Sequence, residues 1–268
     1  WYNFYLVGKS LKSLLFSEDL RILFMSIANQ DLRQLFLAIS FFFTCSFMTP
    51  YAWAGGVSIR NYGNRSLLIK GGGYSVLLNP YKAVGCAFGL KEPRVRADVI
   101  LASSELADEG ARIATGVFLV EPGSYRIDDL QLEGVSAPHD RFGGRRFGQA
   151  TLWQWRQGGL SFAHLGGGVT SLSAENRVII GRPDVLIIGV GGGAKTYNAK
   201  EAAKLARELN PKRVIPVQFV TSPPPTDCDQ TGVEPFLEEM KDVAIKKSGQ
   251  TLRIPSKALD ETIIHLMY

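Results

Sequence analysis

The sequence predicts a four-layer α/β/β/α sandwich built as one globular domain. From residue 57 onward, short alternating or apolar runs are broken by Gly, Pro and Asn, which is typical of many strands. Helical patterns appear only between these runs, so we expect two groups of strands with helices covering the outside. With 46% hydrophobic residues among 268, the chain has enough apolar surface for one core and no need of several domains.

The strands and helices follow from local patterns along the chain. Strands are predicted at 57–62, 66–70, 75–79, 99–102, 117–120, 130–137, 151–156, 160–163, 185–190 and 213–219. The clearest helix spans 198–209, where Asn198 is a good N-cap, Glu201 completes a capping box, and Pro211 ends the helix. A second helix is predicted at 233–240, followed by one or two terminal strands.

The first part of the chain carries targeting signals rather than a core pattern. Met25 is the first methionine, and it is followed by Arg33, an apolar run at 35–48 and the small-residue pattern that ends at Ala54. This order predicts a secretory signal peptide, because the run is shorter than the ~20 residues of a membrane span. We therefore expect export to the periplasm or an equivalent lumen after cleavage near Ala54.

Three segments follow from these signals. Residues 25–54 are the predicted signal peptide, 55–268 the predicted folded domain, and 1–24 an N-terminal extension or sequence upstream of the natural start. The alternative is that 1–54 forms two membrane-associated helices. Contact with a membrane is thus expected only through an uncleaved signal segment.

The charge of the chain does not favour nucleic acid as a partner. The net charge is +5, and the only basic cluster is Arg141, Arg145 and Arg146 in a Gly-rich loop. Nucleic-acid binding needs a basic stripe with aromatic platforms. We expect a solvated loop here instead.

Five stretches in a fixed order resemble a known family. Residues 97–109 have the frame of a T-H-x-H-x-D-H metal loop after a buried strand, with a short helix expected beyond it. The other four stretches are 72–80 (similar to G-x-x-x-L-I-D-P), 135–148 (Y-H-D, G-G, R-G), 160–167 (L-R-I-A-H-L-G-D) and 212–219 (K-x-V-I-P-M-H-Y). Together they resemble the L-ascorbate-6-phosphate lactonase-like branch of the metallo-β-lactamase superfamily, whose members are zinc-dependent hydrolases. The resemblance covers residues 57–222 and implies the same sandwich.

Most metal ligands implied by the resemblance are replaced. Asp108 and His139 keep the family's residue type, while the replaced positions are Ser104, Leu106, Glu109, Gly167 and Gln218. A catalytic zinc needs about three protein ligands and one open place. Glycine at 167 cannot bridge two ions, and leucine at 106 excludes one. We therefore expect no cofactor; if there is one, it is a divalent Zn, Mn or Mg ion.

Two catalytic alternatives stay open. A remodelled divalent-metal site could use Asp108, Glu109 and His139, with oxygen ligands that suit Mg²⁺ or Mn²⁺. A metal-free mechanism could use Ser103 or Ser104 as nucleophile and His139 as base, although the two serines are equally typical of a helix N-cap, which we favour.

The resemblance also implies pocket residues and a disulfide. The pocket candidates are Asp140, Arg145, Arg146, Lys195, Thr196 and Tyr197, and the basic ones favour a small anionic molecule. Cys86 and Cys228 lie in loops that the family places at the mouth of the active site, and an oxidising compartment favours pairing. Free buried cysteines are the alternative.

These observations lead to one function prediction and two alternatives. We expect an exported, non-zinc member of the family with a retained ligand cleft. The alternatives are an active hydrolase of a lactone or phosphoester with a remodelled metal site, and a structural or interaction protein without a ligand. The branch forms oligomers, so a homo-oligomer is a further expectation.

Overall fold

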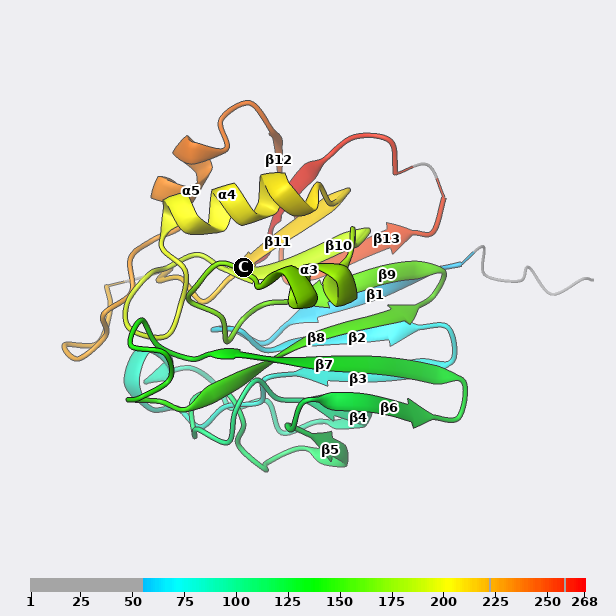
Figure 1. Cartoon of the computed structure of the whole chain (residues 1–268), viewed down its shortest axis with the longest axis horizontal. Coiled ribbons are helices and arrows are strands. Elements are labelled where there is room, and N and C mark those ends of the chain that lie inside the picture. Colours follow the sequence, from blue (N-terminus) through cyan, green and yellow to red (C-terminus); the bar gives the residue numbers. More distant parts are fainter. Residues whose placement is uncertain (1–54, 222, 258) are drawn as a thin grey trace, which may run out of the picture. The chain divides into compact units, whose positions relative to one another are not determined.

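Two β-sheets pack face to face in the part of the chain that the computed structural model describes, residues 55–221, 223–257 and 259–268 (Figure 1). The six-stranded sheet has the order β13 (Thr251–Pro255), β1 (Gly56–Asn61), β2 (Leu67–Gly71), β3 (Tyr74–Leu78), β4 (Arg96–Leu101) and β5 (Thr115–Leu119). The eight-stranded sheet has the order β12 (Ala244–Lys247), β14 (Ile263–Leu266), β11 (Arg213–Val217), β10 (Val185–Gly189), β9 (Leu160–His164), β8 (Gln149–Gln157), β7 (Leu130–Pro138) and β6 (Gly123–Ile127).

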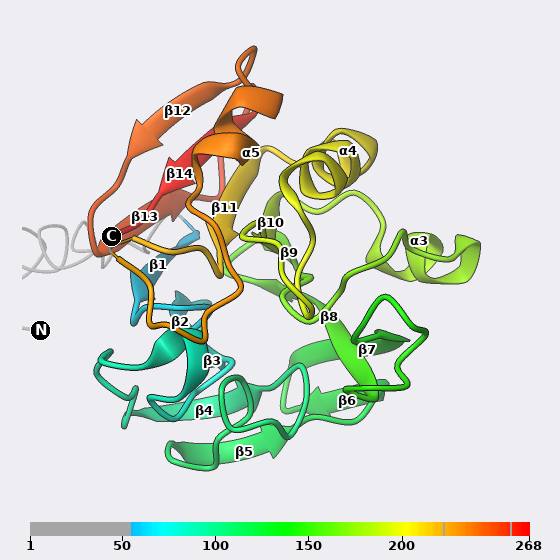
Figure 2. The ribbon, with the colours of Figure 1, turned by 90° about the vertical axis from the view of Figure 1, so that its left-hand side faces the viewer.

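Helices cover the outer face of the eight-stranded sheet (Figure 2). They are α3 (Ala174–Ile180), α4 (Ala199–Leu209) and α5 (Glu234–Glu239). Asn198 is the N-cap of helix α4 and forms a capping box with Glu201. The apolar face of the helix packs on this sheet. The predicted helix over 198–209 is therefore confirmed.

The main core lies between the two sheets. It contains Trp153, Trp155 and Phe162 of the larger sheet, packed against the inward side chains of β1 to β4, such as Leu67 and Ile69. A smaller apolar cluster covers the outer face of the six-stranded sheet, where the described residues place no α-helix. The predicted α/β sandwich is confirmed, with its helices gathered on one side.

Strand direction places loops at one edge of the sandwich. Strands β9, β10, β11 and β14 are parallel, as are β3, β4 and β5, so their carboxyl ends lie at the same edge within each sheet. In sheets of this kind, ligands bind beyond the carboxyl ends of the strands. A site is thus expected at the loops after β3, β4, β9, β10 and β11.

The ten strands predicted with residue bounds are all present, and four local features differ. Strand β6 and helix α3 were not predicted, and three strands, β12 to β14, follow α5 where one or two were expected. The short helix expected after the strand and turn of the metal-loop frame is wrong, because residues 103–114 form only turns and bends. The predictions for residues 1–24 and 25–54 lie outside the described residues. Among the described helices, none is both long and apolar enough to span a bilayer.

Candidate functional site

The loop after β4 is locked to the end of β3. The amide of Asn79 accepts the Ser103 N–H (2.8 Å) and donates to the Ser103 hydroxyl (3.0 Å). Asn79 has a φ of 41°, and Gln218, which follows β11, has a φ of 54°. Non-glycine residues with such dihedrals gather at functional sites. Their position at two strand ends marks this edge as a candidate site.

Ser104 is held by a side chain of its own loop. Its hydroxyl donates to Oε1 of Glu109 (2.6 Å) and accepts the Leu106 N–H (3.2 Å). The favoured reading of this serine as a helix N-cap is therefore wrong, since no helix follows. The Ser104 hydroxyl donates to Glu109 and not to His139. Ser104 and His139 are therefore not arranged as a nucleophile and its base.

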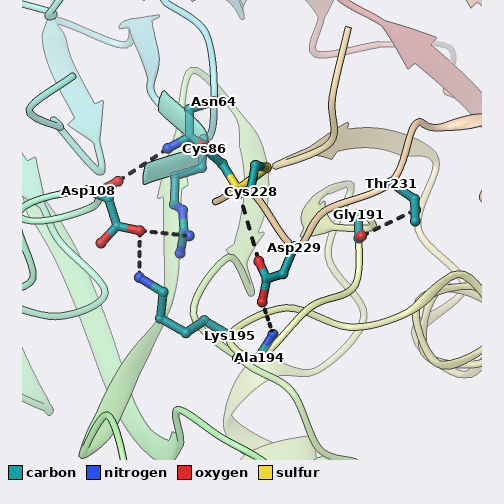
Figure 3. Close-up of a disulfide and its surroundings, with 10 residues drawn as sticks. Asn64, Cys86, Asp108, Gly191, Ala194, Lys195, Cys228, Asp229 and Thr231 are labelled. Carbon is teal, nitrogen blue, oxygen red and sulfur yellow. Dashed lines mark hydrogen bonds and ion pairs between the residues drawn. A yellow bond between two sulfur atoms is a disulfide. The ribbon is translucent and has the colours of Figure 1, made fainter. Parts of the chain in front are cut away.

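Lys195 and Asp108 meet at the mouth of the site. Nζ of Lys195 lies 2.5 Å from Oδ2 of Asp108, and both side chains are about one-fifth exposed (Figure 3). The backbone oxygen of Asp108 accepts from the Asn64 amide (3.2 Å). Lys195 lies on the loop after β10, so this pair joins loops of the two sheets.

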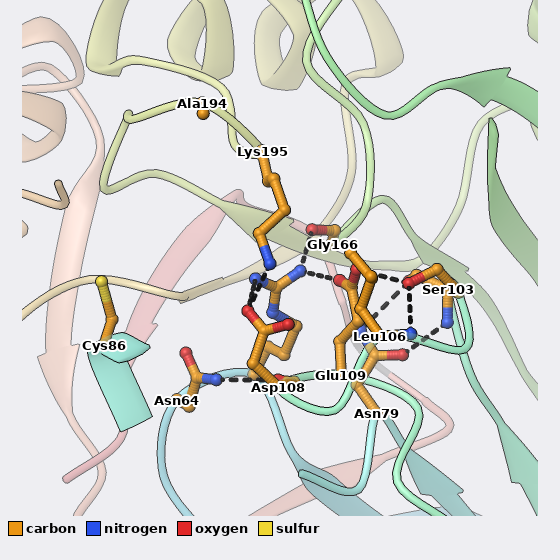
Figure 4. A network of polar contacts seen from close by, with 12 residues as sticks. Asn64, Asn79, Cys86, Ser103, Leu106, Asp108, Glu109, Gly166, Ala194 and Lys195 are labelled. Carbon is orange, nitrogen blue, oxygen red and sulfur yellow. Dashed lines mark hydrogen bonds and ion pairs between the residues drawn. The ribbon is translucent and has the colours of Figure 1, made fainter. Parts of the chain in front are cut away.

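A fully buried arginine, Arg65, lies behind this pair. Its guanidinium donates to the Glu109 carboxylate and to the carbonyl oxygen of Gly166 (3.2 Å), and it lies 3.8 Å from Oδ2 of Asp108. Figure 4 shows Asp108, Glu109 and Gly166 in the same network of polar contacts. Arg65 and Glu109 are both 0% exposed. A charge buried this completely requires a partner, because desolvation penalises it strongly. The two carboxylates of the metal-loop frame thus contact side-chain cations of the protein itself.

His139 completes the environment of Glu109. Its Nε2 lies 2.8 Å from Oε1 of Glu109, and the ring is fully buried. Burial alone would raise the pKa of Glu109, but Arg65, then His139 and Lys195, outweigh it and hold this pKa well below its usual range. Glu109 is therefore a carboxylate in the folded protein.

The glycine at 167 has no room for the aspartate that the family places there. A Cβ atom built on Gly167 would lie 2.7 Å from the Cβ atoms of both Ser103 and Ala150. The space of the bridging carboxylate is filled by these two side chains. Restoring an aspartate would therefore require the loop after β4 and strand β8 to move apart.

The remaining side chains do not fit a dinuclear zinc centre. Leu106 offers no ligand atom, and Gln218 offers only a neutral amide. Among the described residues, no three His, Cys, Asp or Glu side chains are grouped as metal ligands would be. The donors retained from the family, Asp108 and His139, are paired with Lys195 and Glu109. The donor set and its geometry thus disagree with the metal that the fold family implies.

His164, at the end of β9, lies next to this centre. It is 0% exposed, and neither ring nitrogen has a hydrogen-bond partner among the described residues. Burial and then the nearby Arg65 charge lower the pKa of His164 to about 3. The ring is therefore neutral. A Cβ atom built on Gly166 would lie 2.5 Å from its Cε1 atom, so the ring packs against this glycine.

Two predicted pocket residues serve the backbone instead. The Asp140 carboxylate accepts backbone N–H groups from Phe142, Gly144, Arg146 and Phe147 at 2.8 to 3.0 Å. Burial would raise its pKa, but these bonds lower the pKa to about 2. Asp140 thus closes the 141–147 loop. Arg145 is exposed and donates to the Phe142 carbonyl (3.1 Å).

Arg146 and Lys195 share an aromatic ring. The Arg146 guanidinium carbon lies 4.7 Å, and Lys195 Nζ 5.4 Å, from the centre of the Phe147 ring. These are distances at which a cation and an aromatic face attract. Phe147 also lines a cavity of about 520 Å³ together with Ser104 and Leu106. Arg146 and Lys195 do not line this cavity, but both lie against Phe147, which forms part of its wall.

The other two pocket candidates are buried. Tyr197 is 1% exposed and belongs to the core under α4, and burial raises its pKa. Thr196 is 0% exposed, and its carbonyl accepts from Arg141 (3.4 Å). Both residues support the loop that presents Lys195.

The sequence interpretation missed Arg65, although a signal for it exists. Side chains alternate between the two faces of a strand. Arg65 lies in the turn just before β2, two residues before Leu67, which faces the core between the sheets as Ile69 does. An arginine at the start of such an inward series, among residues that resemble a metal enzyme, indicates a buried cation.

Comparison with known proteins agrees with the fold. A family model for the β-lactamase superfamily domain matches residues 58–218. The chain is 28% identical over 137 residues to a UPF0173 metal-dependent hydrolase of Pyrococcus furiosus. The matched region covers 49% of this chain and 59% of that protein. It is 24% identical over 226 residues to a UPF0173 metal-dependent hydrolase of Thermococcus onnurineus, covering 74% of this chain and 100% of that one.

A solved structure has the same architecture. The protein from Thermotoga maritima, assigned to the Zn-dependent hydrolases of the metallo-β-lactamase superfamily, superposes with a TM-score of 0.64 at 22% identity. The match covers 79% of this chain and 98% of that one. At this level of identity the likeness shows the fold alone.

Proposed function

Since this chain belongs to the β-lactamase superfamily and has the fold of its metal-dependent hydrolases, we propose that it is a member without a zinc centre, which binds a small anionic ligand in the retained cleft. Fold alone does not decide function. Function depends on the side chains at this site.

The observation that carries the proposal is the buried guanidinium of Arg65. It contacts Glu109, lies 3.8 Å from Asp108, and carries the positive charge next to the metal-loop frame. With Lys195 on Asp108, two cations balance two carboxylates. A divalent ion would have to enter beside two existing cations, which Coulomb repulsion at these short distances opposes.

The mouth of the cleft supports an anionic ligand. Lys195 keeps about one-fifth of its side chain exposed, and Arg146 is exposed beside it. Both flank Phe147, whose ring gives a flat apolar wall. A carboxylate or phosphate group with a short apolar body matches this combination of charge and surface.

Export is part of the same proposal. What supports it is the disulfide between Cys86 and Cys228, since disulfides persist in oxidising compartments. It agrees with the signal peptide predicted to end near Ala54.

Metal content tests the first half of the proposal. The purified protein is equilibrated with Zn²⁺, Mn²⁺ or Mg²⁺, freed of unbound ions, and analysed for elements. We expect well under one ion per chain for each metal. One ion per chain, lost in both Asp108→Ala and His139→Ala, would contradict the proposal and support a hydrolase with a remodelled metal site.

Ligand-dependent melting tests the second half. A panel of inorganic phosphate, sugar phosphates and small carboxylates should include at least one anion that raises the melting temperature, because a ligand of the folded state stabilises it by mass action. Lys195→Ala and Arg146→Ala should lower the affinity for that anion. The matched controls are Lys200→Ala on the exposed side of α4 and Arg145→Ala in the same loop. No response to any anion would favour a protein without a ligand.

A further inference from the structure

The Cys86–Cys228 disulfide lies near the loop that presents Lys195. It joins the 3-10 helix η1 (Gly85–Ala87), which follows β3, to the loop between β11 and α5, and 142 residues separate the two cysteines (Figure 3). Both are partly exposed. The bond therefore ties a loop of the six-stranded sheet to a loop of the eight-stranded sheet.

Asp229, the residue after Cys228, holds the glycine loop that follows β10. Its carboxylate accepts the Ala194 N–H at 2.7 Å. A Cβ on Gly193, whose φ is 79°, would lie 2.6 Å from this carboxylate, so only glycine allows the approach. Next to it, the Thr231 N–H donates to the Gly191 carbonyl (2.8 Å).

Lys195 directly follows the amide that Asp229 holds. Its ammonium group contacts Asp108, whose backbone oxygen is fixed by Asn64 on the other side of the cleft. A continuous series of contacts thus runs from the disulfide through Asp229 and Ala194 to Lys195. It ends at the cation that the proposed anion site uses.

We propose that the Cys86–Cys228 disulfide and Asp229 are positioning groups that hold Lys195 on Asp108, so that reduction of the disulfide loosens Lys195 and weakens anion binding. The expected loss of anion binding rests on the proposed function, whereas the contact between Lys195 and Asp108 and the exchange of the Ala194 amide can be measured without it. A dithiol is the reductant. It breaks the S–S bond, gives one hydrogen to each cysteine sulfur, and becomes a cyclic disulfide itself.

Reduction should affect this loop more than the core. The segment around Cys228 is mostly exposed and contains the three prolines 223–225, while the sheets on either side are packed on apolar residues. Segments with few buried contacts open at low free energy. Without the S–S bond, the hydrogen bonds of Asp229 to Ala194 and of Thr231 to Gly191 remain to hold this loop.

Zero-length cross-linking and amide exchange test the proposal directly. A water-soluble carbodiimide joins an amine and a carboxylate that touch, and peptide mass analysis then measures the Lys195 to Asp108 product. The Lys204 and Glu208 pair on α4 serves as the internal control. Hydrogen exchange at the Ala194 amide is followed in the same samples. The full chain is compared in oxidised and dithiol-reduced forms.

The two aspartates of the loop give a matched pair of variants. Asp229→Ala removes the contact with Ala194 and leaves the disulfide intact, and Asp227→Ala removes the same charge from the same loop at an exposed position. We expect reduction and Asp229→Ala each to speed Ala194 exchange by about tenfold, the factor that one lost charge-assisted hydrogen bond implies. The Lys195 to Asp108 product should fall, with Asp227→Ala and the Lys204 control unchanged.

Affinity for inorganic phosphate, measured by calorimetry, separates this inference from the proposed function. If phosphate and the other anions of the panel fail to bind the oxidised protein while the cross-link still depends on the disulfide, the proposed function fails and the positioning inference stands. Unchanged cross-linking and exchange after reduction, or in Asp229→Ala, would overturn the inference whether or not an anion binds.

Discussion

Replacing Arg65 by methionine should destabilise the protein strongly. The guanidinium is 0% exposed, and its main partner, Glu109, is also 0% exposed. Removing one member of a buried ion pair costs about 3–5 kcal/mol, because the other charge stays buried without compensation. Against a typical stability of about 5–15 kcal/mol, the free energy of unfolding should fall by about a fifth or more.

A double-mutant cycle separates this pair from general packing. Glu109→Gln alone should also destabilise, because it leaves the arginine uncompensated. The double variant Arg65→Met/Glu109→Gln should recover at least about 2 kcal/mol relative to the sum of the two single changes. Denaturant unfolding at pH 7 measures these values, with the fluorescence of the buried Trp153 and Trp155 as the signal.

Acid titration adds a second readout to the same variants. The pKa of Glu109 is held below its ordinary value of 4.5 in the folded state. Its contribution to stability is therefore present above about pH 4.5 and lost as the pH falls. Arg65→Met should flatten this acid limb. A loss of under about 1 kcal/mol on Arg65→Met, with no coupling to Glu109, would refute the reasoning about a buried charge pair.

Three further predictions follow from the surroundings of Arg65. Gly167→Asp should lower the free energy of unfolding by about 1–3 kcal/mol, the usual cost of overpacking, and restore no zinc in elemental analysis, because Ser103 and Ala150 fill the space. The pKa of His164 is about 3 in the folded state against 6.5 ordinarily, so the free energy of unfolding is full above pH 6.5 and falls as the pH drops toward 3. His164→Gln should remove this dependence of stability on pH, measured by denaturant titrations from pH 7 to 4. Asp140→Ala should speed amide exchange throughout the 141–147 loop while the exchange of α4 stays constant.

Periodic patterns in the sequence were enough to predict most of the fold. Helix α4 combines a capping box with an apolar stripe, and both signals are local. Helix α3 has seven residues and buries only Ile180, so it lacks a stripe. Strand β6 lies at an open edge with mostly exposed side chains, which weakens the alternation that predicts a strand. Weak burial thus explains both omissions.

The site was predicted less completely, because its contacts join distant residues. The family resemblance drew attention to Asp108, Glu109 and His139, and the structure brings the three around one cluster of ion pairs. The cation that meets them, Arg65, lies 44 residues from Glu109 in the sequence. Tyr197 was expected in the pocket and lies in the core, since the fold, not its motif, decides which way the ring points.

The buried guanidinium has a consequence for how the protein meets its surroundings. A bound metal stabilises a folded chain only in proportion to the logarithm of its free concentration, so a metalloprotein becomes less stable when the ion is scarce. Arg65 is covalently part of the chain, and neither a chelator nor dilution can withdraw it. If the protein holds no metal, as proposed, its folded population should be the same in metal-starved and metal-rich environments.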